Sequence, residues 1–336
     1  MLKNNHFYIN NLDKIIILGT HQDIKQLLDV NNLLGIKTTI ITTTSQSKQM
    51  NLKSNCYKFD KIDKRFENFI KKNFDVKKTL FISISARYIF KKKTISNLFN
   101  NNLINFHGSR LPLDAGGGGY SWRILREDRI DTQLCHVIND RIDNGEILFH
   151  ETSLFPNYCK IPIDFEKYHN KNFISFYKKV IQKIMKGKVK LIDQPEYSGR
   201  YNPRLYSKTD GAIDWDLNPH DLFNFINAFD DPYEGAFTYL DNGNFGKLNL
   251  KSVHLHAGDS SNHPFMSGIV SRHDKNWIVV CTKSKYMLLI EKVINKNKKN
   301  IINKIKVGDR FHTPLNKIMI ARKKRNFFNS KGLKKN

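Results

Sequence analysis

The sequence has no long apolar run and few cysteines. None of its apolar segments approaches the roughly 20 residues that span a bilayer, and the start, Met1 to His6, lacks the apolar core of a signal peptide. The cysteines are far apart, with neither metal-ligand spacing nor the density of a disulfide scaffold: Cys56, Cys135, Cys159 and Cys281. We therefore expect a cytoplasmic protein with reduced thiols, no membrane partner and no metal.

Acidic residues are also scarce, because 31 Asp and Glu stand against 56 Lys and Arg and leave a net charge of +25. Such an excess suits a polyanionic partner such as nucleic acid. However, the basic residues are spread along the chain, with a final concentration at 322–325 and at Lys331, Lys334 and Lys335. Since Lys, Asn and Ile are abundant throughout, we favour genome composition as the origin of the charge. The net charge alone therefore does not identify a partner.

The glycine fingerprint of a dinucleotide site is missing as well. The first apolar strand, 14–18, ends at Gly19-Thr20, and no Gly-x-Gly-x-x-Gly run follows, which excludes a nicotinamide oxidoreductase. The backbone N–H groups of Gly19 and Thr20 could bind an anion at this strand-to-helix turn. The alternative, which we favour, is that Gly19 serves only a tight turn.

The first half of the chain alternates short apolar strands with helical patterns, which predicts an α/β fold with a Rossmann-like open parallel sheet and flanking helices. The expected strands are 14–18, 38–42, 80–84, 103–106 and 133–138, and the expected helices begin near Ile24, near Phe66 and at Asp164. We assign residues 1–194 to this domain.

The second half predicts a smaller β-rich domain. A turn-rich linker covers 195–207, and Asn218-Pro219 is expected to begin a helix with Leu222, Ile226 and Phe229 on one side. Expected strands follow at 236–240, 247–255, 268–271, 277–281 and 287–290, the pattern of a small β-barrel or sandwich. This domain covers 208–320, and the basic tail, 321–336, is expected to have no regular structure.

One segment concentrates polar groups that can perform chemistry. Asn105 and His107 alternate along a strand, so they share a face, and Asp143 follows His107 by 36 residues. An amide, an imidazole and a carboxylate can together stabilise an oxyanion and manage the proton of an attacking amine. Each residue has an ordinary alternative, because Asn-x-His can cap a loop and Asp143 precedes a turn dipeptide, Asn144-Gly145.

The combined pattern, Asn-x-His-x-Ser-x-Leu-Pro at 105–112 with Asp-x-Gly at 143–145, resembles the formyltransferases that use 10-formyltetrahydrofolate. That family includes methionyl-tRNA, glycinamide-ribonucleotide and amino-sugar enzymes. The segments 213–215, 236–239 and 307–309 resemble the C-terminal, OB-like domain of the methionyl-tRNA enzymes. The resemblance implies that Asn105, His107 and Asp143 are catalytic, with Asp143 orienting His107, and that 10-formyltetrahydrofolate is the co-substrate.

The resemblance also implies where the folate binds. Its pterin is expected against two segments, mainly through backbone groups: Arg87, Tyr88, Ile89 and Phe90, and Asn139, Asp140, Arg141 and Ile142. Core packing is an alternative role for Ile89, Phe90 and Ile142, and the two roles are compatible.

The sequence specifies the acceptor amine less closely than the catalytic residues or the folate site. Candidate substrate-binding residues are Gly19, Thr20 and Arg110 for a phosphate, and Gly116 and Gly117 of the four-glycine run. Four glycines permit the close approach of a bulky acceptor or simply a mobile loop, and Arg110 could equally be a solvated surface residue.

Methionyl-tRNA enzymes usually carry a basic loop after the second strand, but here 42–50 is polar and scarcely basic. We therefore favour a nucleotide-linked amino sugar or a similar small amine as the acceptor. The second domain and the positive charge keep methionyl-tRNA as the alternative. A non-catalytic basic RNA-binding protein is a lesser one, since it would need no complete Asn–His–Asp set. The sequence does not predict the oligomeric state.

Overall fold

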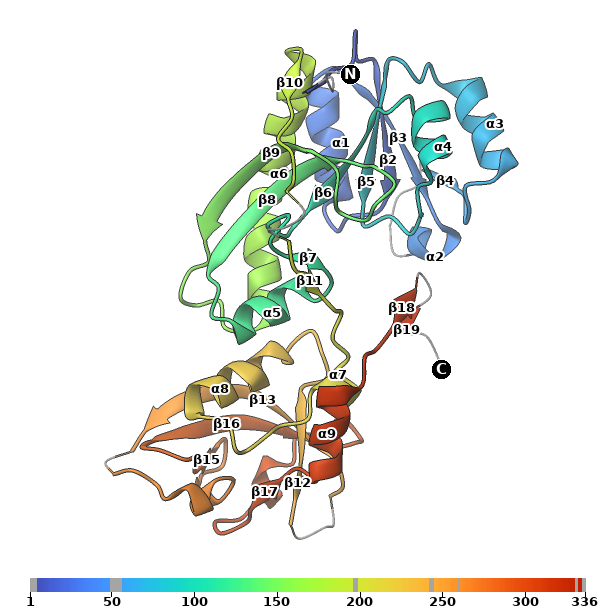
Figure 1. Cartoon of the computed structure of the whole chain (residues 1–336). Helices are drawn as coiled ribbons and strands as arrows, with labels where there is room; N and C mark the ends of the chain where they lie inside the picture. The colour runs from blue at the N-terminus through green and yellow to red at the C-terminus, as the bar shows by residue number, and fades with distance from the viewer. Residues whose placement is uncertain are drawn as a thin grey trace. The chain divides into compact units, whose positions relative to one another are not determined.

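The structure, a computed structural model, describes residues 5–48, 56–195, 199–241, 245–258, 260–329 and 332–333. The chain forms two compact units (Figure 1): Met1–Gly116, Ile130–Leu154 and His169–Tyr201 make the first, and Gly117–Arg129, Phe155–Tyr168 and Asn202–Asn336 the second. Two segments of the predicted 1–194 domain, 117–129 and 155–168, therefore group with the second unit. Their apolar residues Ile124, Phe155 and Phe165 share a core with Ile213 and Leu222.

The first unit contains a seven-stranded sheet of order β4-β3-β2-β5-β6-β8-β9. Its strands are β2 Lys14–Gly19, β3 Lys37–Thr42, β4 Cys56–Lys58, β5 Thr79–Ile84, β6 Leu103–His107, β8 Ile130–Val137 and β9 Ile147–Leu154. The strands from β4 to β6 are parallel, whereas β8 and β9 are antiparallel to their neighbours. The α/β prediction is confirmed, but the sheet is mixed rather than wholly parallel. An antiparallel neighbour starts at the edge where the previous strand ends, so it needs no crossover.

Helices cover both faces of this sheet (Figure 1). On one face, α1 Ile24–Leu33 and α6 Pro162–Met185 pack with alternate strand residues such as Ile15 and Ile17. On the other, α3 Lys64–Asn73 and α4 Lys92–Asn97 pack with Ile16 and Leu18. A central strand buried on both faces has this near-continuous apolar sequence. The shorter elements are α2 Thr44–Ser47, the pair β1 His6–Phe7 with β10 Val189–Lys190, and the pair β7 Ala115–Gly116 with β11 Tyr201–Asn202.

The second unit is built on an antiparallel sheet of order β14-β15-β16-β13-β12-β17. Its strands are β12 Ala236–Leu240, β13 Leu248–Ala257, β14 Val270–His273, β15 Ile278–Val280, β16 Tyr286–Ile294 and β17 Phe311–His312. The two edges also meet, because Ile269 pairs with Arg310 and the Phe311 N–H donates to the Gly268 carbonyl. The sheet therefore curls towards a small barrel, as the strand pattern predicts.

Helices α5 Gly119–Leu125, α7 Ser207–Asp210 and α8 Pro219–Ala228 belong to the second unit, with single turns at Pro264–Met266 and Ile302–Lys304. The predicted start of α8 is confirmed: Asn218 is the N-cap, and its side chain accepts a hydrogen bond from the Asp221 N–H at 2.9 Å. Leu222, Ile226 and Phe229 are all buried, so the predicted apolar side of this helix faces the core.

The expectation of no regular structure after Ile320 is wrong for the described part of the tail. Helix α9 spans Leu315–Lys323, and β18 Phe328–Asn329 pairs with β19 Gly332–Leu333. Beyond α9, the Asn326 amide donates to Asp210 at 3.0 Å, and the Arg204 guanidinium lies over the Phe328 ring. These side chains attach the tail to its own unit. Lys331, Lys334 and Lys335 lie outside the described residues, as do Glu196 to Ser198 of the predicted linker.

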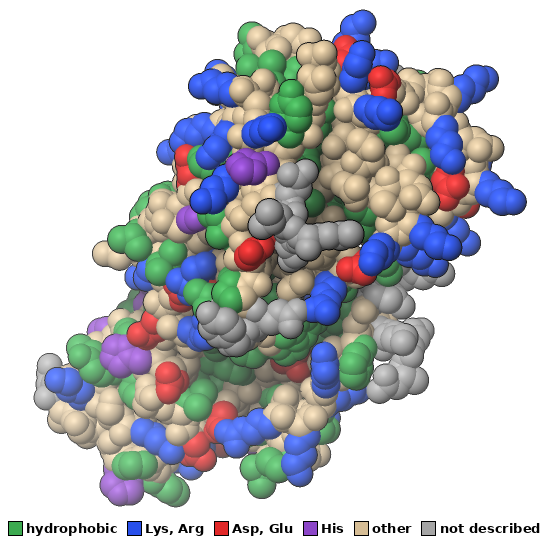
Figure 2. Space-filling model, turned by 45° about the horizontal axis from the view of Figure 1, so that its top comes forward, with side chains coloured by type: hydrophobic (Ala, Val, Ile, Leu, Met, Phe, Trp, Pro, Cys, Tyr) green, Lys and Arg blue, Asp and Glu red, His purple; other side chains and the backbone are tan. Residues whose placement is uncertain are grey.

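The surface agrees with a spread positive charge. Figure 2 shows Lys and Arg side chains scattered over the face in view and interspersed with Asp and Glu. All four cysteines are free thiols, and Cys135, Cys159 and Cys281 are buried. Within the described ranges, no helix is both long and apolar enough to cross a membrane.

Candidate active site

A pocket of about 490 Å³ lies in the first unit, lined by the last residues of β5, β6 and β8 and by the segments that follow β5 and β8. It gathers the three predicted catalytic residues and all but one of the predicted pterin-binding residues. Its lining includes Asn105, His107, Asp143, Tyr88, Ile89, Phe90, Asn139, Asp140, Arg141 and Ile142. The exception is Arg87, whose guanidinium donates to the Ser45 hydroxyl at 3.0 Å. Segments distant in sequence thus form one cavity.

The three polar side chains meet inside this pocket. Asn105 and His107 lie on β6, two residues apart, and both line the cavity as strand alternation predicts. The His107 Nε2 lies 4.0 Å from the Asp143 Oδ2, and each side chain is 18% exposed. Partial burial reduces the screening of this pair while leaving both groups accessible to a ligand.

The Asp-x-Gly turn has a geometric explanation. Asp143 adopts a left-handed backbone conformation, with φ of 55°. A Cβ on Gly145 would lie 1.7 Å from the Val137 carbonyl oxygen, so only glycine lets this loop approach β8. The Gln194 amide donates to the carbonyls of Asp143, at 3.2 Å, and Gly145, at 2.5 Å. The loop that presents the Asp143 carboxylate is therefore held from both sides.

His136 is a site residue that the sequence analysis missed. It lies opposite Asn105 in the β6–β8 pairing, and the Asn105 amide nitrogen is 3.1 Å from the His136 Nε2. The His136 Nδ1 is 2.9 Å from the Val137 carbonyl and so carries the ring proton, which leaves Nε2 to accept from Asn105. This bond orients the amide. The available signal was a single His near the end of the predicted strand 133–138, which becomes informative only when the pairing is known.

Two of the predicted acceptor-binding residues form a close turn. A Cβ on Gly19 would lie 2.1 Å from the Ile84 carbonyl oxygen, and the Thr20 N–H donates to the same oxygen at 3.0 Å. The close approach to Ile84 thus explains why a glycine stands at this tight turn. The Thr20 N–H already has a hydrogen-bond acceptor within the protein.

The other acceptor candidates also have intramolecular contacts. Arg110 lies 3.5 Å from the Asp114 carboxylate, which Arg200 approaches to 3.2 Å. Gly116 has φ of 100°, and a Cβ on Gly117 would lie 2.9 Å from the Cβ of Arg204. None of Gly19, Thr20, Arg110, Gly116 and Gly117 is among the residues that line the pocket, and their role in binding an acceptor stays a prediction.

Comparison with known proteins agrees with this architecture. Residues 206–305 match the family "Formyl transferase, C-terminal domain". The methionyl-tRNA formyltransferase of Mycoplasma mycoides is 24% identical over 328 residues, which cover 90% of this chain and 100% of that protein. The chain thus carries the C-terminal domain of the formyltransferase family and is similar to a formyltransferase along nearly its whole length. Both the resemblance and the predicted enzyme class are confirmed.

Two further comparisons place this formyltransferase among its relatives. The bifunctional polymyxin resistance protein ArnA of Wigglesworthia glossinidia brevipalpis is 31% identical over 148 residues, covering 40% of this chain but only 20% of that protein. An N-formyltransferase from Helicobacter canadensis, solved with folinic acid and dTDP-3-aminofucose, shares the fold with a TM-score of 0.62 at 15% identity; the match covers 83% of this chain and 99% of that one.

Burial lowers the pKa of His136 in this formyltransferase to about 4, and the electrostatic influence of the neighbouring His107 acts in the same direction. The folded protein thus holds a neutral ring that the unfolded chain protonates near pH 6.5. We therefore expect the free energy of unfolding to fall by roughly 2 kcal/mol from this group as the pH drops from 7 to 5.

Urea unfolding at pH 7, 6 and 5 measures this effect. A His136→Gln variant, whose amide oxygen can still accept from Asn105, should lose much of the decline. His150→Gln, which alters an exposed histidine of β9, should retain it. An unchanged decline in His136→Gln would show that His136 is not held neutral.

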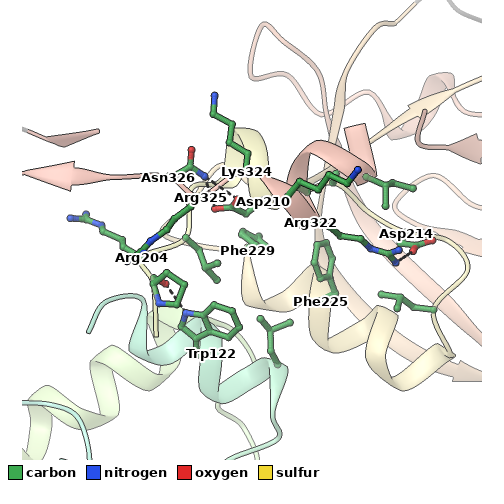
Figure 3. Close-up of a pocket in the computed structure, with 18 residues that line it drawn as sticks. Trp122, Arg204, Asp210, Asp214, Phe225, Phe229, Arg322, Lys324, Arg325 and Asn326 are labelled. Carbon is green, nitrogen blue, oxygen red and sulfur yellow. Dashed lines mark hydrogen bonds and ion pairs between the residues drawn. The ribbon is translucent and has the colours of Figure 1, made fainter. Parts of the chain in front are cut away.

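A second pocket of about 510 Å³ lies entirely within the second unit (Figure 3). Trp122, Phe225 and Phe229 line it, and the Trp122 indole N–H donates to the Pro203 carbonyl at 2.8 Å. At its edge, the Arg322 guanidinium forms an ion pair with the Asp214 carboxylate at 2.6 Å. It contains none of the predicted catalytic residues. Across the described part of the chain, no group of three or more His, Cys, Asp or Glu side chains could hold a metal ion.

Proposed function

We propose that this formyltransferase moves the formyl group of 10-formyltetrahydrofolate onto a primary amine. The observation that carries the proposal is the meeting of Asn105, His107 and Asp143 in one pocket. The same pocket is lined by Ile89 and Ile142, which are 83% and 86% exposed. Large apolar side chains left open at a cavity suit a flat ring such as a pterin. The folinic acid in the Helicobacter canadensis structure supports this choice.

Each polar side chain has a role in this reaction. The amine nitrogen attacks the formyl carbon, and Asn105, oriented by His136, donates to the oxyanion that forms. His107 donates a second hydrogen bond to the same oxygen. Asp143 orients the imidazole and accepts the amine proton through a water. The carbon–nitrogen bond to the folate then breaks, and that proton returns to the folate nitrogen, which balances the transfer.

As the acceptor we propose a nucleotide-linked amino sugar. The dTDP-3-aminofucose bound in the Helicobacter canadensis relative supports this choice. So does the segment after β3, where α2 itself contains no Lys or Arg and is tied to an acidic residue: the Thr44 N–H and hydroxyl both donate to Asp60, at 2.8 and 2.9 Å. Gln49 and Met50 of this segment lie outside the described residues. Methionyl-tRNA stays the second candidate because the Mycoplasma enzyme is matched over its full length.

The test supplies purified protein and 10-formyltetrahydrofolate with charged initiator tRNA in one reaction and nucleotide-linked amino sugars in others. We expect formylation of an amino sugar, and tRNA binding that is weak and strongly salt-dependent because it rests on dispersed lysines. A folate analogue should also raise the unfolding temperature through binding to the native state.

The outcomes separate the two levels of the proposal. Selective formylation of methionyl initiator tRNA at moderate salt would overturn the amino-sugar acceptor and leave formyl transfer standing. Absence of transfer to any amine, together with no stabilisation by folate, would overturn formyl transfer itself.

A further inference from the structure

A buried polar cluster lies on the face of β8 opposite the active-site pocket. It consists of Asp131 and Gln133 of β8 and His169 of α6, all belonging to the first unit. Asp131 is fully buried and His169 is 7% exposed. Strand alternation explains the separation, because Asp131 and Gln133 point towards α6 whereas His136 points into the pocket. The proposed chemistry uses none of the three.

The cluster fixes the His169 ring from two sides. The His169 Nδ1 lies 2.8 Å from the Asp131 Oδ1, and the Gln133 amide donates to the His169 carbonyl at 2.8 Å. The Gln133 amide nitrogen also lies 3.0 Å from Nδ1. Because the carboxylate is closer and charged, it is the stronger partner, so Nδ1 carries its hydrogen towards Asp131. The opposite edge of the ring, with Nε2, is thereby directed away from the carboxylate.

That opposite edge packs against the backbone that carries His107. A Cβ on Gly108 would lie 3.0 Å from the His169 Nε2 and 3.2 Å from Cε1. Gly108 directly follows His107 at the end of β6, so its Cα faces α6 while the His107 side chain faces the pocket. The imidazole of His169 therefore forms a back wall one residue beyond the catalytic position.

The surrounding contacts show that this interface can also be packed with apolar residues. Immediately beside it, β6 meets α6 through aromatic rings, with Phe106 packed on Phe173 and Tyr177 at centroid distances of 5.5 and 5.2 Å. A buried Asp–His pair loses its hydration, and apolar residues of similar volume often stabilise a core as well or better. What the pair supplies beyond apolar packing is a ring with a fixed direction.

We propose that His169, held by Asp131 and Gln133, is a positioning residue for His107. By limiting the backbone at Gly108, it sets the separation of His107 and Asp143, which at 4.0 Å is at the margin of an ion pair. A shift at Gly108 changes this separation and with it the strength of the interaction between the two groups. This inference rests on the proposed formyl transfer.

A double-mutant cycle on Gly108 and His169 tests the contact. Gly108→Ala places a methyl group against the ring, and His169→Ala removes the ring; each should lower kcat by about 10-fold or more with little change in KM for the folate. In Gly108→Ala/His169→Ala the added methyl enters the space that the ring leaves. We expect this double variant to lose less than the product of the single losses. His169→Asn, which keeps a donor near Asp131, should recover part of kcat.

Tyr177→Phe is the matched control. It removes another buried hydrogen bond of α6, the one that the Asn31 amide donates to the Tyr177 hydroxyl at 2.9 Å. This variant should lower the unfolding temperature without lowering kcat. Thermal unfolding of all variants measures the Gly108–His169 coupling independently of activity. If the wild-type enzyme is active and His169→Ala and Gly108→Ala both keep its kcat, the positioning role is overturned. A wild type that transfers no formyl group would overturn the proposed function and this inference together, and the thermal cycle would still show whether the two residues touch.

Discussion

We expect Asp143→Asn and His107→Ala each to lower formyl transfer by about 100-fold or more, with the protein still folded. His107 and Asp143 lie 4.0 Å apart, and both line the pocket that holds Asn105. In the proposed mechanism, Asp143→Asn removes the charge that orients the imidazole and the group that accepts the amine proton. His107→Ala removes a proposed donor to the oxyanion. Steady-state rates with a verified acceptor measure the loss, and thermal unfolding reports on the fold.

Two exposed residues of the same unit provide matched controls for these substitutions. Asp193→Asn removes an exposed carboxylate and His150→Ala an exposed imidazole, and neither residue lines the pocket. Both variants should turn over like the wild type. Near-normal turnover in Asp143→Asn or His107→Ala would show that the assigned chemistry is wrong, whatever the acceptor.

We expect Gly145→Ala to have an effect of similar size for a different reason. Its Cβ would lie 1.7 Å from the Val137 carbonyl oxygen, a separation that no side-chain rotation relieves. The loop must move away from β8, and Asp143, two residues earlier, moves with it. Because misplacing a catalytic group by about 1 Å can cost about 100-fold in rate, we expect a loss of at least that size, together with reduced stability.

Gly35→Ala separates strain from loss of the site. Gly35 has φ of 73° and no atom within 4 Å of an added Cβ, so alanine there is strained but not obstructed. That variant should lose stability and keep its turnover. If Gly145→Ala kept normal turnover, the loop would be able to rearrange without moving Asp143, and the close approach to Val137 would not matter for activity.

Short-range patterns determined much of this protein. The strand alternation that places Asn105 and His107 on one face, the N-cap at Asn218 and the apolar side of α8 all depend on residues within a few positions of one another. Backbone periodicity enforces such relations whatever the rest of the chain does. The spacing of Asn105, His107 and Asp143 indicated the resemblance to formyltransferases, which the comparisons confirm.

The tertiary structure decided what depends on partners distant in sequence. Strand β8 pairs with β6 in antiparallel orientation, and this pairing brings His136 opposite Asn105. The clash that requires glycine at 145 is set by the Val137 carbonyl, and the ring that confines Gly108 comes from α6. The assignment of 117–129 and 155–168 to the second unit likewise follows from where their apolar side chains are buried. Local sequence specifies the face of a side chain, and only long-range packing specifies its neighbour.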